Sequence, residues 1–285
     1  VKAETKLKLT IARPDSHNAL TAQVRSHRKF HYRMKGLVRT EEMVANETVI
    51  LRMTTSGWKI TGVRPAAEGA FPSGPAQRMM EQLAQPGNRE SSHWLAGKSA
   101  PLLHQAAAVP GGYVRPDSIR YNRERAREYA DKWWNSANPD YLHFDVDCTN
   151  FVSQCIFAGG APMNYTGRKD SGWWYRVRSG GRELWSYSWA VVGSLQFYLL
   201  TSRSGLRARE VEDPRQLAPG DVICYDWDGN GRYRHSTIVT AKDGNGMPLV
   251  NAHTVSSRRR YWSYKDSPAW TDNTRYRFLH IADTL

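Results

Sequence analysis

Two of the chain's three cysteines lie seven residues apart in the stretch DCTNFVSQCIFAGG, which starts at Asp147. Its apolar residues recur at helical spacing and its two final glycines would end a helix. Two helical turns, about 10 Å, separate the sulfurs too far for a disulfide. Cys155 falls on the apolar face and is predicted to pack in the core. Cys148 falls in the first turn, where unsatisfied N–H groups and the helix dipole favour a thiolate. Position alone leaves nucleophilic and structural roles equally open for Cys148.

A nucleophilic cysteine needs a base, and His235 is the best candidate in the sequence. It follows a glycine-rich turn and begins the stretch HSTIVTA, so a strand would hold it on rigid backbone. The next expected strand, PLVNAHT, carries Asn251 and His253 two residues apart, and therefore on one face. Either side chain could orient the imidazole as the third member of a triad.

Tryptophans are concentrated between the expected nucleophile and the expected base. Trp173 and Trp174 could form the wall of a groove that grips a peptide or sugar, or they could pack inside. Trp189 lies four residues after Trp185, a spacing that favours packing of a helix into the core, although a substrate contact stays open. Asp147, directly before the cysteine, is the expected N-cap and could assist the oxyanion site beside the Cys148 N–H group.

The segment DWDGNG resembles the first half of a calcium-binding loop through Asp226, Asp228 and Asn230. The twelfth position is Thr237 instead of glutamate, and no second helix is expected after it. A tight hairpin turn is the favoured interpretation. We therefore expect neither a metal nor a cofactor.

The elements that must position these residues fall into three zones. Residues 1–66 alternate apolar and polar positions and are predicted to form a β-rich accessory module. Residues 67–118 are rich in Pro, Gly and Ala, a composition typical of a linker. Residues 119–285 begin with helical patterns, one capped by Ser118 and a second across SYSWAVVGSLQFYLLTSR, and end with strands and glycine turns. Helices followed by an antiparallel sheet indicate an α+β domain.

The 285 residues have a net charge of +13 and a pI of about 9.8, with 40% hydrophobic residues. This charge favours anionic partners such as wall polymers, membranes or nucleic acid. No apolar run is long enough to span a bilayer. Three cysteines give no closed disulfide framework, which fits a reducing compartment or an exported protein from an organism that uses few disulfides. The opening VKAETK lacks Met and an apolar leader, so we expect targeting information upstream.

Five stretches together resemble the bacterial putative amidase domain family: YNRERAREYADKWW, DCTNFVSQCIFAGG, SWAVVGSLQFYLL, LAPGDVICYDWDGNGRYRHSTIVT and NAHT. The resemblance covers residues 119–285. It implies a papain-like fold related to CHAP and other cell-wall cysteine peptidases. It further implies Cys148 as nucleophile, His235 as base and His253 as third member, with Asn251 in reserve. The expected substrates are peptides such as those of peptidoglycan, and the expected location is the bacterial envelope, with the cytoplasm as the alternative.

A second interpretation is a non-catalytic binder of an anionic polymer, either a wall polymer or nucleic acid, on the same scaffold. Against it, Cys148, His235 and His253 are all present. The β-rich module lacks the aromatic and basic signature of known nucleic-acid readers, which makes nucleic acid the weaker expectation. A thiol probe that labels only Cys148 would favour the enzyme, whereas salt-dependent DNA binding without thiol reactivity would favour the binder.

Overall fold

The computed structural model describes residues 2–16, 18–34, 37–65, 119–177 and 183–285. The segment predicted to be a linker, residues 67–118, lies outside them. The described strands form a ten-stranded antiparallel sheet in the order β1-β2-β3-β11-β10-β9-β8-β12-β7, with β4 added on β3. A separate two-stranded hairpin joins β5 and β6.

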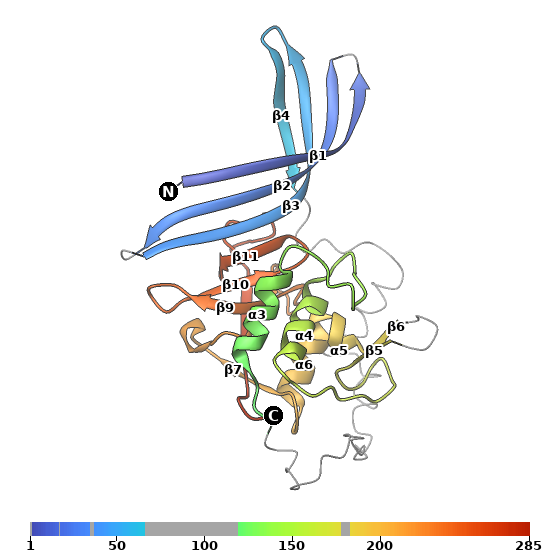
Figure 1. Ribbon diagram of the computed structural model, residues 1–285, viewed down its shortest axis with the longest axis vertical. Coiled ribbons are helices and arrows are strands. Elements are labelled where there is room, and N and C mark those ends of the chain that lie inside the picture. Colours follow the sequence, from blue (N-terminus) through green and yellow to red (C-terminus); the bar gives the residue numbers. More distant parts are fainter. Residues whose placement is uncertain (1, 17, 35–36, 66–118, 178–182) are drawn as a thin grey trace.

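The N-terminal region is a meander of four long strands that extends away from the rest of the molecule (Figure 1). Alternating apolar and polar side chains suit each strand to a sheet with two different faces. The β3–β4 hairpin turns at Gly57, whose φ of +103° is a conformation that glycine adopts without strain. The four strands are β1 (Lys2–Ser16), β2 (Ala19–Met34), β3 (Leu37–Thr54) and β4 (Gly57–Pro65).

Four α-helices follow in the described residues, and they depart from the sequence-based expectation at two places. They are α3 (Arg123–Trp133), α4 (Cys148–Ala158), α5 (Tyr187–Ala190) and α6 (Val192–Thr201). The N-cap of α3 is Asn122, whose Oδ1 accepts from the Arg125 N–H at 3.0 Å, so this helix begins later than predicted. The expected cap, Ser118, lies outside the described residues. The expected helix across residues 187–201 is broken at Val191, a β-branched residue in extended conformation.

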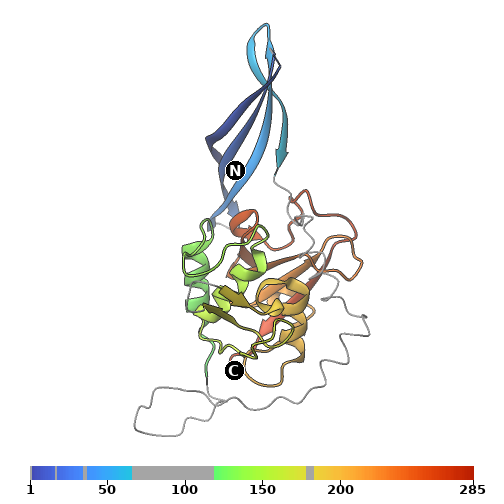
Figure 2. The same ribbon diagram turned by 90° about the vertical axis from the view of Figure 1, so that its right-hand side faces the viewer.

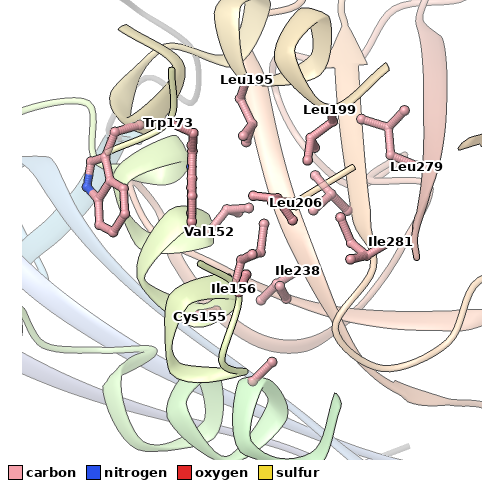
Figure 3. Packing of buried hydrophobic residues seen from close by; sticks show 14 of the residues in the cluster. Val152, Cys155, Ile156, Trp173, Leu195, Leu199, Leu206, Ile238, Leu279 and Ile281 are labelled. Carbon is pink, nitrogen blue, oxygen red and sulfur yellow. The ribbon is translucent and has the colours of Figure 1, made fainter. Parts of the chain in front are cut away.

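The C-terminal strands place the helices and an aromatic cluster on opposite faces of the sheet. Helix-side residues such as Ile238 and Leu279 pack with α4 and α6 in the larger apolar cluster (Figure 3). On the other face, Tyr225 and Val239 pack with Tyr264. The strands are β5 (Tyr175–Val177), β6 (Glu183–Trp185), β7 (Ala208–Val211), β8 (Val222–Asp226), β9 (His235–Lys242), β10 (Pro248–Ala252), β11 (Ser256–Tyr261) and β12 (Arg275–Ile281).

The N-terminal meander shares its sheet with the C-terminal region. Strand β3 pairs antiparallel with β11, with Glu42 opposite Arg258. Arg258 Nη1 lies 3.5 Å from Glu42 Oε1, and its Nε donates to Asp131 Oδ1 of α3 at 3.1 Å. Figure 2 shows the meander rising from this junction while the remaining elements pack below it. The β-rich module therefore extends the edge of the C-terminal sheet.

Candidate active site

Cys148 is the first residue of α4, and its side chain is almost completely buried. Asp147 occupies the N-cap position, but its carboxylate makes no hydrogen bond to the first turn of the helix backbone. It accepts instead from the Phe144 N–H at 3.1 Å and from Asn150 Nδ2 at 2.8 Å. The start of α4 is therefore fixed by side chains around Asp147, and its free N–H groups remain near the thiol.

The thiol of Cys148 is surrounded by hydroxyl groups from α4 and β9. Burial raises its pKa, and the backbone N–H of Ser236 and the hydroxyls of Thr149 and Ser236 oppose this rise in part. Thr149 Oγ1 lies 3.8 Å from the sulfur and 3.0 Å from Ser236 Oγ. These contacts dock the N-terminus of α4 directly onto the start of β9.

His235 begins β9, as expected, but its ring lies on the other face of the sheet from Cys148. Its neighbour Ser236 faces α4, and adjacent residues of a strand point to opposite sides. The imidazole sits 5.4 Å from the rings of Tyr225 and Tyr264 and 5.9 Å from Trp227, measured between centroids. Burial lowers its pKa to about 3. Within the described residues, its Nε2 has no hydrogen-bond partner.

His253 lies on the α4 side of the sheet and links the C-terminal end of α3 to the N-terminal end of α4. Its Nδ1 is 2.6 Å from Asp147 Oδ2, its Nε2 is 2.7 Å from the Trp133 carbonyl oxygen, and its ring stacks on Phe151 at 4.0 Å. Burial opposes ionisation of Asp147, yet hydrogen bonds from His143 and His253 hold its pKa at about 2. A carboxylate and a carbonyl can only accept, so the ring satisfies both bonds when it carries both protons.

Asn251 is engaged in a third set of contacts, away from both histidines. Its Oδ1 accepts from Thr240 Oγ1 at 2.9 Å and from the Arg259 N–H at 2.8 Å, and its Nδ2 donates to Asp131 Oδ1 at 3.1 Å. The structure thus places His253 against Asp147, the residue that precedes Cys148. It leaves His235 on the opposite face and places Asn251 in the network that holds α3.

The tryptophans expected at a substrate groove are enclosed in the interior. Trp173 and Trp189 are fully buried with ring centroids 4.9 Å apart, and Trp174 is 1% exposed. The indole of Trp189 donates to Asn150 Oδ1 at 2.8 Å and that of Trp173 to Ser153 Oγ at 3.0 Å. Both bonds reach α4, so these rings brace the helix that carries the cysteine. In this arrangement they present no surface to a substrate.

Two further residues at the start of α4 were not singled out by the sequence analysis. His143 is 63% exposed, with its Nδ1 3.6 Å from Asp147 Oδ2, and the hydrogen bond to Asp147 raises its pKa. It lies in a loop without periodicity, which gave no signal. Ser236 follows His235 directly, and the period-two alternation of a strand allows only one of the two to face α4.

The acidic hairpin after β8 is organised by its own backbone. Asp226 is buried and accepts from the N–H groups of Asn230 at 3.3 Å and Gly231 at 2.6 Å. Asp228 lies 3.6 Å from Arg234. Among the described residues, no group of three or more potential metal ligands is assembled. The carboxylates of this turn therefore have structural partners of their own.

No helix in the described part of the chain is long and apolar enough to cross a membrane. No solved structure matches the chain. Two proteins of Bacillus subtilis (strain 168) are similar to it, each named an uncharacterized protein. YhbB is 53% identical over 166 residues, 58% of this chain and 52% of that protein. YjcM is 26% identical over 175 residues, 58% of this chain and 36% of that protein. The chain thus spans about half the length of YhbB and about a third of YjcM.

The family comparison covers the region that contains the whole candidate site. Residues 120–279, more than half of the chain, match the family described as "Putative amidase domain". The match begins just before α3 and ends within β12, and so includes Cys148, His235 and His253. The four-stranded meander lies outside it. The chain belongs to the putative amidase domain family.

Proposed function

We propose that this chain is a cysteine-dependent amidase with Cys148 as its nucleophile. One observation carries the proposal: within an amidase-family domain, a cysteine begins a buried helix beside the Asp147–His253 pair. Helix N-termini favour thiolates and offer N–H donors to an oxyanion. Asp147 and Phe151 hold His253 at the same end of α4. A cysteine that only packed in the core would not need a histidine there.

The proposed reaction is acyl transfer through a thioester. The Cys148 thiol gives its proton to a histidine, and the sulfur attacks the amide carbonyl carbon. The carbon–nitrogen bond breaks as the histidine returns that proton to the leaving amine. Water then attacks the thioester with the histidine as base, which releases the carboxylic acid and regenerates the thiol. The N–H groups of the first turn of α4 are the proposed oxyanion donors.

Two histidines are candidates for the base, and their surroundings differ. His253 is on the α4 side of the sheet, but its Nε2 must release its proton and leave the Trp133 carbonyl before it can take the proton of the thiol. His235 has an unbonded Nε2 but lies across the sheet, so it would need a rearrangement of the start of β9. The geometry supports His253, whereas the family resemblance favours His235 with His253 as the orienting group. Both assignments are proposals, and substitution of each histidine in turn distinguishes between them.

The proposed substrates are amide bonds of cell-wall peptides, and the proposed site of action is the bacterial envelope. The net charge of +13 supports attraction to an anionic wall. The related Bacillus proteins are uncharacterized and add no substrate information. Stem peptides and intact peptidoglycan are therefore the first substrates to test.

A mass-spectrometric assay of peptidoglycan digests tests the proposal. We expect Cys148→Ala to reduce hydrolysis by about 10³-fold or more, and the loss of the true base to reduce it by about 10²- to 10⁴-fold. His253→Ala and His235→Ala, measured in parallel, identify that base. Cys155→Ala is the matched control, because its sulfur is buried on the apolar face of the same helix. Equal product from wild type and Cys148→Ala would refute the assignment.

A non-catalytic binding protein on the same scaffold is the second candidate. It is favoured by the raised pKa of the Cys148 thiol and by the lack, among the described residues, of a hydrogen bond from a histidine to its sulfur. Iodoacetamide labelling at pH 7 distinguishes the two. An enzyme is alkylated first at Cys148, whereas a binding protein shows no preference for this thiol over Cys155 and Cys224.

A further inference from the structure

One face of the N-terminal meander carries nearly all of its exposed cations. Strand register places Lys8 opposite Arg25 on β1 and β2, and Arg52 opposite Lys59 on β3 and β4. Ala19, on the same face as Arg25, is opposite Arg52, so both pairs share one face. The same face also carries Glu4 and Glu42, each paired with a lysine. We call the part of it beyond these two carboxylates the cationic face and define it by Lys6, Lys8, Arg13, Arg25, His27, Arg52, Lys59 and Arg64.

Two of its cross-strand pairs oppose like charges. Lys8 and Arg25 are direct partners, as are Arg52 and Lys59, and all four side chains are exposed. Directly opposed like charges destabilise a sheet. Among the described residues, no carboxylate lies within ion-pair distance of these four cations. Other cations of the meander do have partners: Arg28 Nη2 lies 2.6 Å from Glu47 Oε1, and Lys29 Nζ lies 2.9 Å from Glu42 Oε2. The unpaired cations therefore suit an anion from outside the chain.

A hollow of about 250 Å³ lies at the end of the cationic face, against the C-terminal region. Arg25 reaches across it, and its Nη2 donates to the backbone oxygen of Asn135 at 3.0 Å. His27 stands beside Trp134 with ring centroids 5.9 Å apart, and its Nε2 is 2.9 Å from Glu42. The residues that line the hollow are Lys6, Leu7, Lys8, Arg25, His27, Val44 and Asn135.

We propose that the cationic face binds a linear phosphodiester polymer that carries no bases, with one phosphate in the hollow. Lys6, Lys8 and Arg25 surround the hollow with ammonium and guanidinium donors, which suit the several oxygens of a phosphate. The Arg52–Lys59 pair lies six strand positions away, about 20 Å at the rise of a β-strand, so one small anion cannot reach both ends. Cations two residues apart along a strand, such as Lys6 and Lys8, repeat at about 7 Å.

The side chains of the face argue against single-stranded nucleic acid. Proteins bind such strands by stacking bases on aromatic rings within a basic groove. The described side chains on this face of the four strands include no Phe, Tyr or Trp. The exposed Trp58 belongs to the opposite face, because its strand neighbour Lys59 lies on the cationic one. A polymer of phosphate and polyol fits a face that offers charge without stacking.

Fluorescence anisotropy of a labelled poly(glycerol phosphate) with the full chain tests the proposal without use of the catalytic assay. We expect the double variants Lys8→Gln/Arg25→Gln and Arg52→Gln/Lys59→Gln each to weaken binding about 10-fold or more at 50 mM salt. Each should also lower the slope of log K against log salt by about 1.4, for two lost phosphate contacts at about 0.7 each. Arg125→Gln/Arg203→Gln removes the same charge from exposed positions outside the face. This control should change binding less than threefold.

Several outcomes would overturn the proposal. Equal losses in the control would show that net charge alone attracts the polymer. Undiminished binding by both face variants would remove the face from the interaction. Tighter binding of oligo-dT with the same number of phosphates would indicate a nucleic-acid site, and equal binding of polyglutamate would show that phosphate is not selected. Without polymer, Arg52→Gln/Lys59→Gln is expected to melt no lower than wild type, because it loses only a like-charge pair. Lys8→Gln/Arg25→Gln also loses the bond to Asn135, so its melting temperature must be shown to lie above the assay temperature before its loss of binding is assigned to the face.

Discussion

The meander and the amidase-family domain share one sheet but bury their side chains very differently. In the domain, large residues such as Trp189 and Leu195 are completely enclosed. In the described meander, the buried apolar cluster consists of Ala22, Val24 and Val49, and Leu9 and Ile60 are 60% and 58% exposed. The domain is therefore stabilised by a core that encloses a site. The meander depends on strand pairing, including that with β11, and contributes an exposed surface.

The two regions also treat charge differently. In the domain, two buried carboxylates have basic partners: Asp147 bonds His253, and Arg123 Nη1 lies 2.6 Å from the fully buried Asp221. In residues 1–65, thirteen Lys and Arg accompany five Asp and Glu, and cations oppose each other across strands. Buried charge must be paired to be tolerated, whereas exposed charge is solvated and is free to bind a partner from solution. The contrast predicts where substitutions destabilise the fold and where they do not.

The largest expected difference between the regions concerns their cores. Trp189→Ala should lower the free energy of unfolding by about 3–5 kcal/mol, because it empties a large enclosed site beside α4. Val49→Ala should cost about 1–2 kcal/mol, since it removes little more than two methyl groups from a thin cluster. Urea unfolding of both variants measures the difference. Equal losses would show that the meander has a core comparable to that of the domain.

The next largest expected loss of stability concerns the buried pair of Asp147 and His253. Asp147→Ala should cost about 3 kcal/mol, because it leaves His253 without its charged partner. The pKa of Asp147 is about 2, below its ordinary 3.8, so its contribution is present above pH 4 and lost as pH falls towards 2. Thermal unfolding between pH 2 and 5 should show this loss in wild type and a flatter profile in Asp147→Asn. Identical acid profiles would mean that the pair adds no stability.

A smaller effect on stability, with the opposite pH dependence, is expected for Glu41 of β3, close to the pairing of β3 with β11. Burial, together with Asp266, raises the pKa of Glu41 from 4.5 to about 7, despite the opposing charge of Arg260. A raised folded-state pKa means that stability falls as pH rises from about 4.5 to 7. Glu41→Gln should therefore stabilise the chain at pH 8 by on the order of 2 kcal/mol and have little effect at pH 4. Melting temperatures at the two pH values provide the measurement, and equal shifts at both would contradict the prediction.

The smallest expected effect concerns the exposed cations. Arg52→Glu would place opposite charges across β3 and β4, and should raise stability by about 0.2–1 kcal/mol at low salt. The gain should shrink at 1 M salt, where exposed charges are screened. Differential scanning calorimetry at both salt concentrations suffices. A loss of stability would mean that Arg52 has a favourable contact that its exposure does not reveal.

Local pattern was enough to predict most elements of this chain. The alternation of apolar and polar residues predicted the strands of the β-rich module, and the apolar spacing with Gly159-Gly160 predicted α4. Predictions that depended on neighbours in space were less accurate. Asp147 occupies the N-cap position, but His253, 106 residues away, binds its carboxylate. The break at Val191 likewise cannot be seen in a pattern that suits one continuous helix.

Local sequence is sufficient to predict that a cysteine begins a buried helix and that His235 begins a strand, because both depend on residues within a few positions. Which face of β9 meets α4 depends on tertiary packing. Alternation fixes that His235 and Ser236 point in opposite directions, but the choice between them depends on how the whole helix layer packs on the sheet. The same holds for the Asp147–His253 pair and for the joining of β3 to β11. These contacts link residues far apart in the chain, and their free energy depends on burial that no local stretch contains.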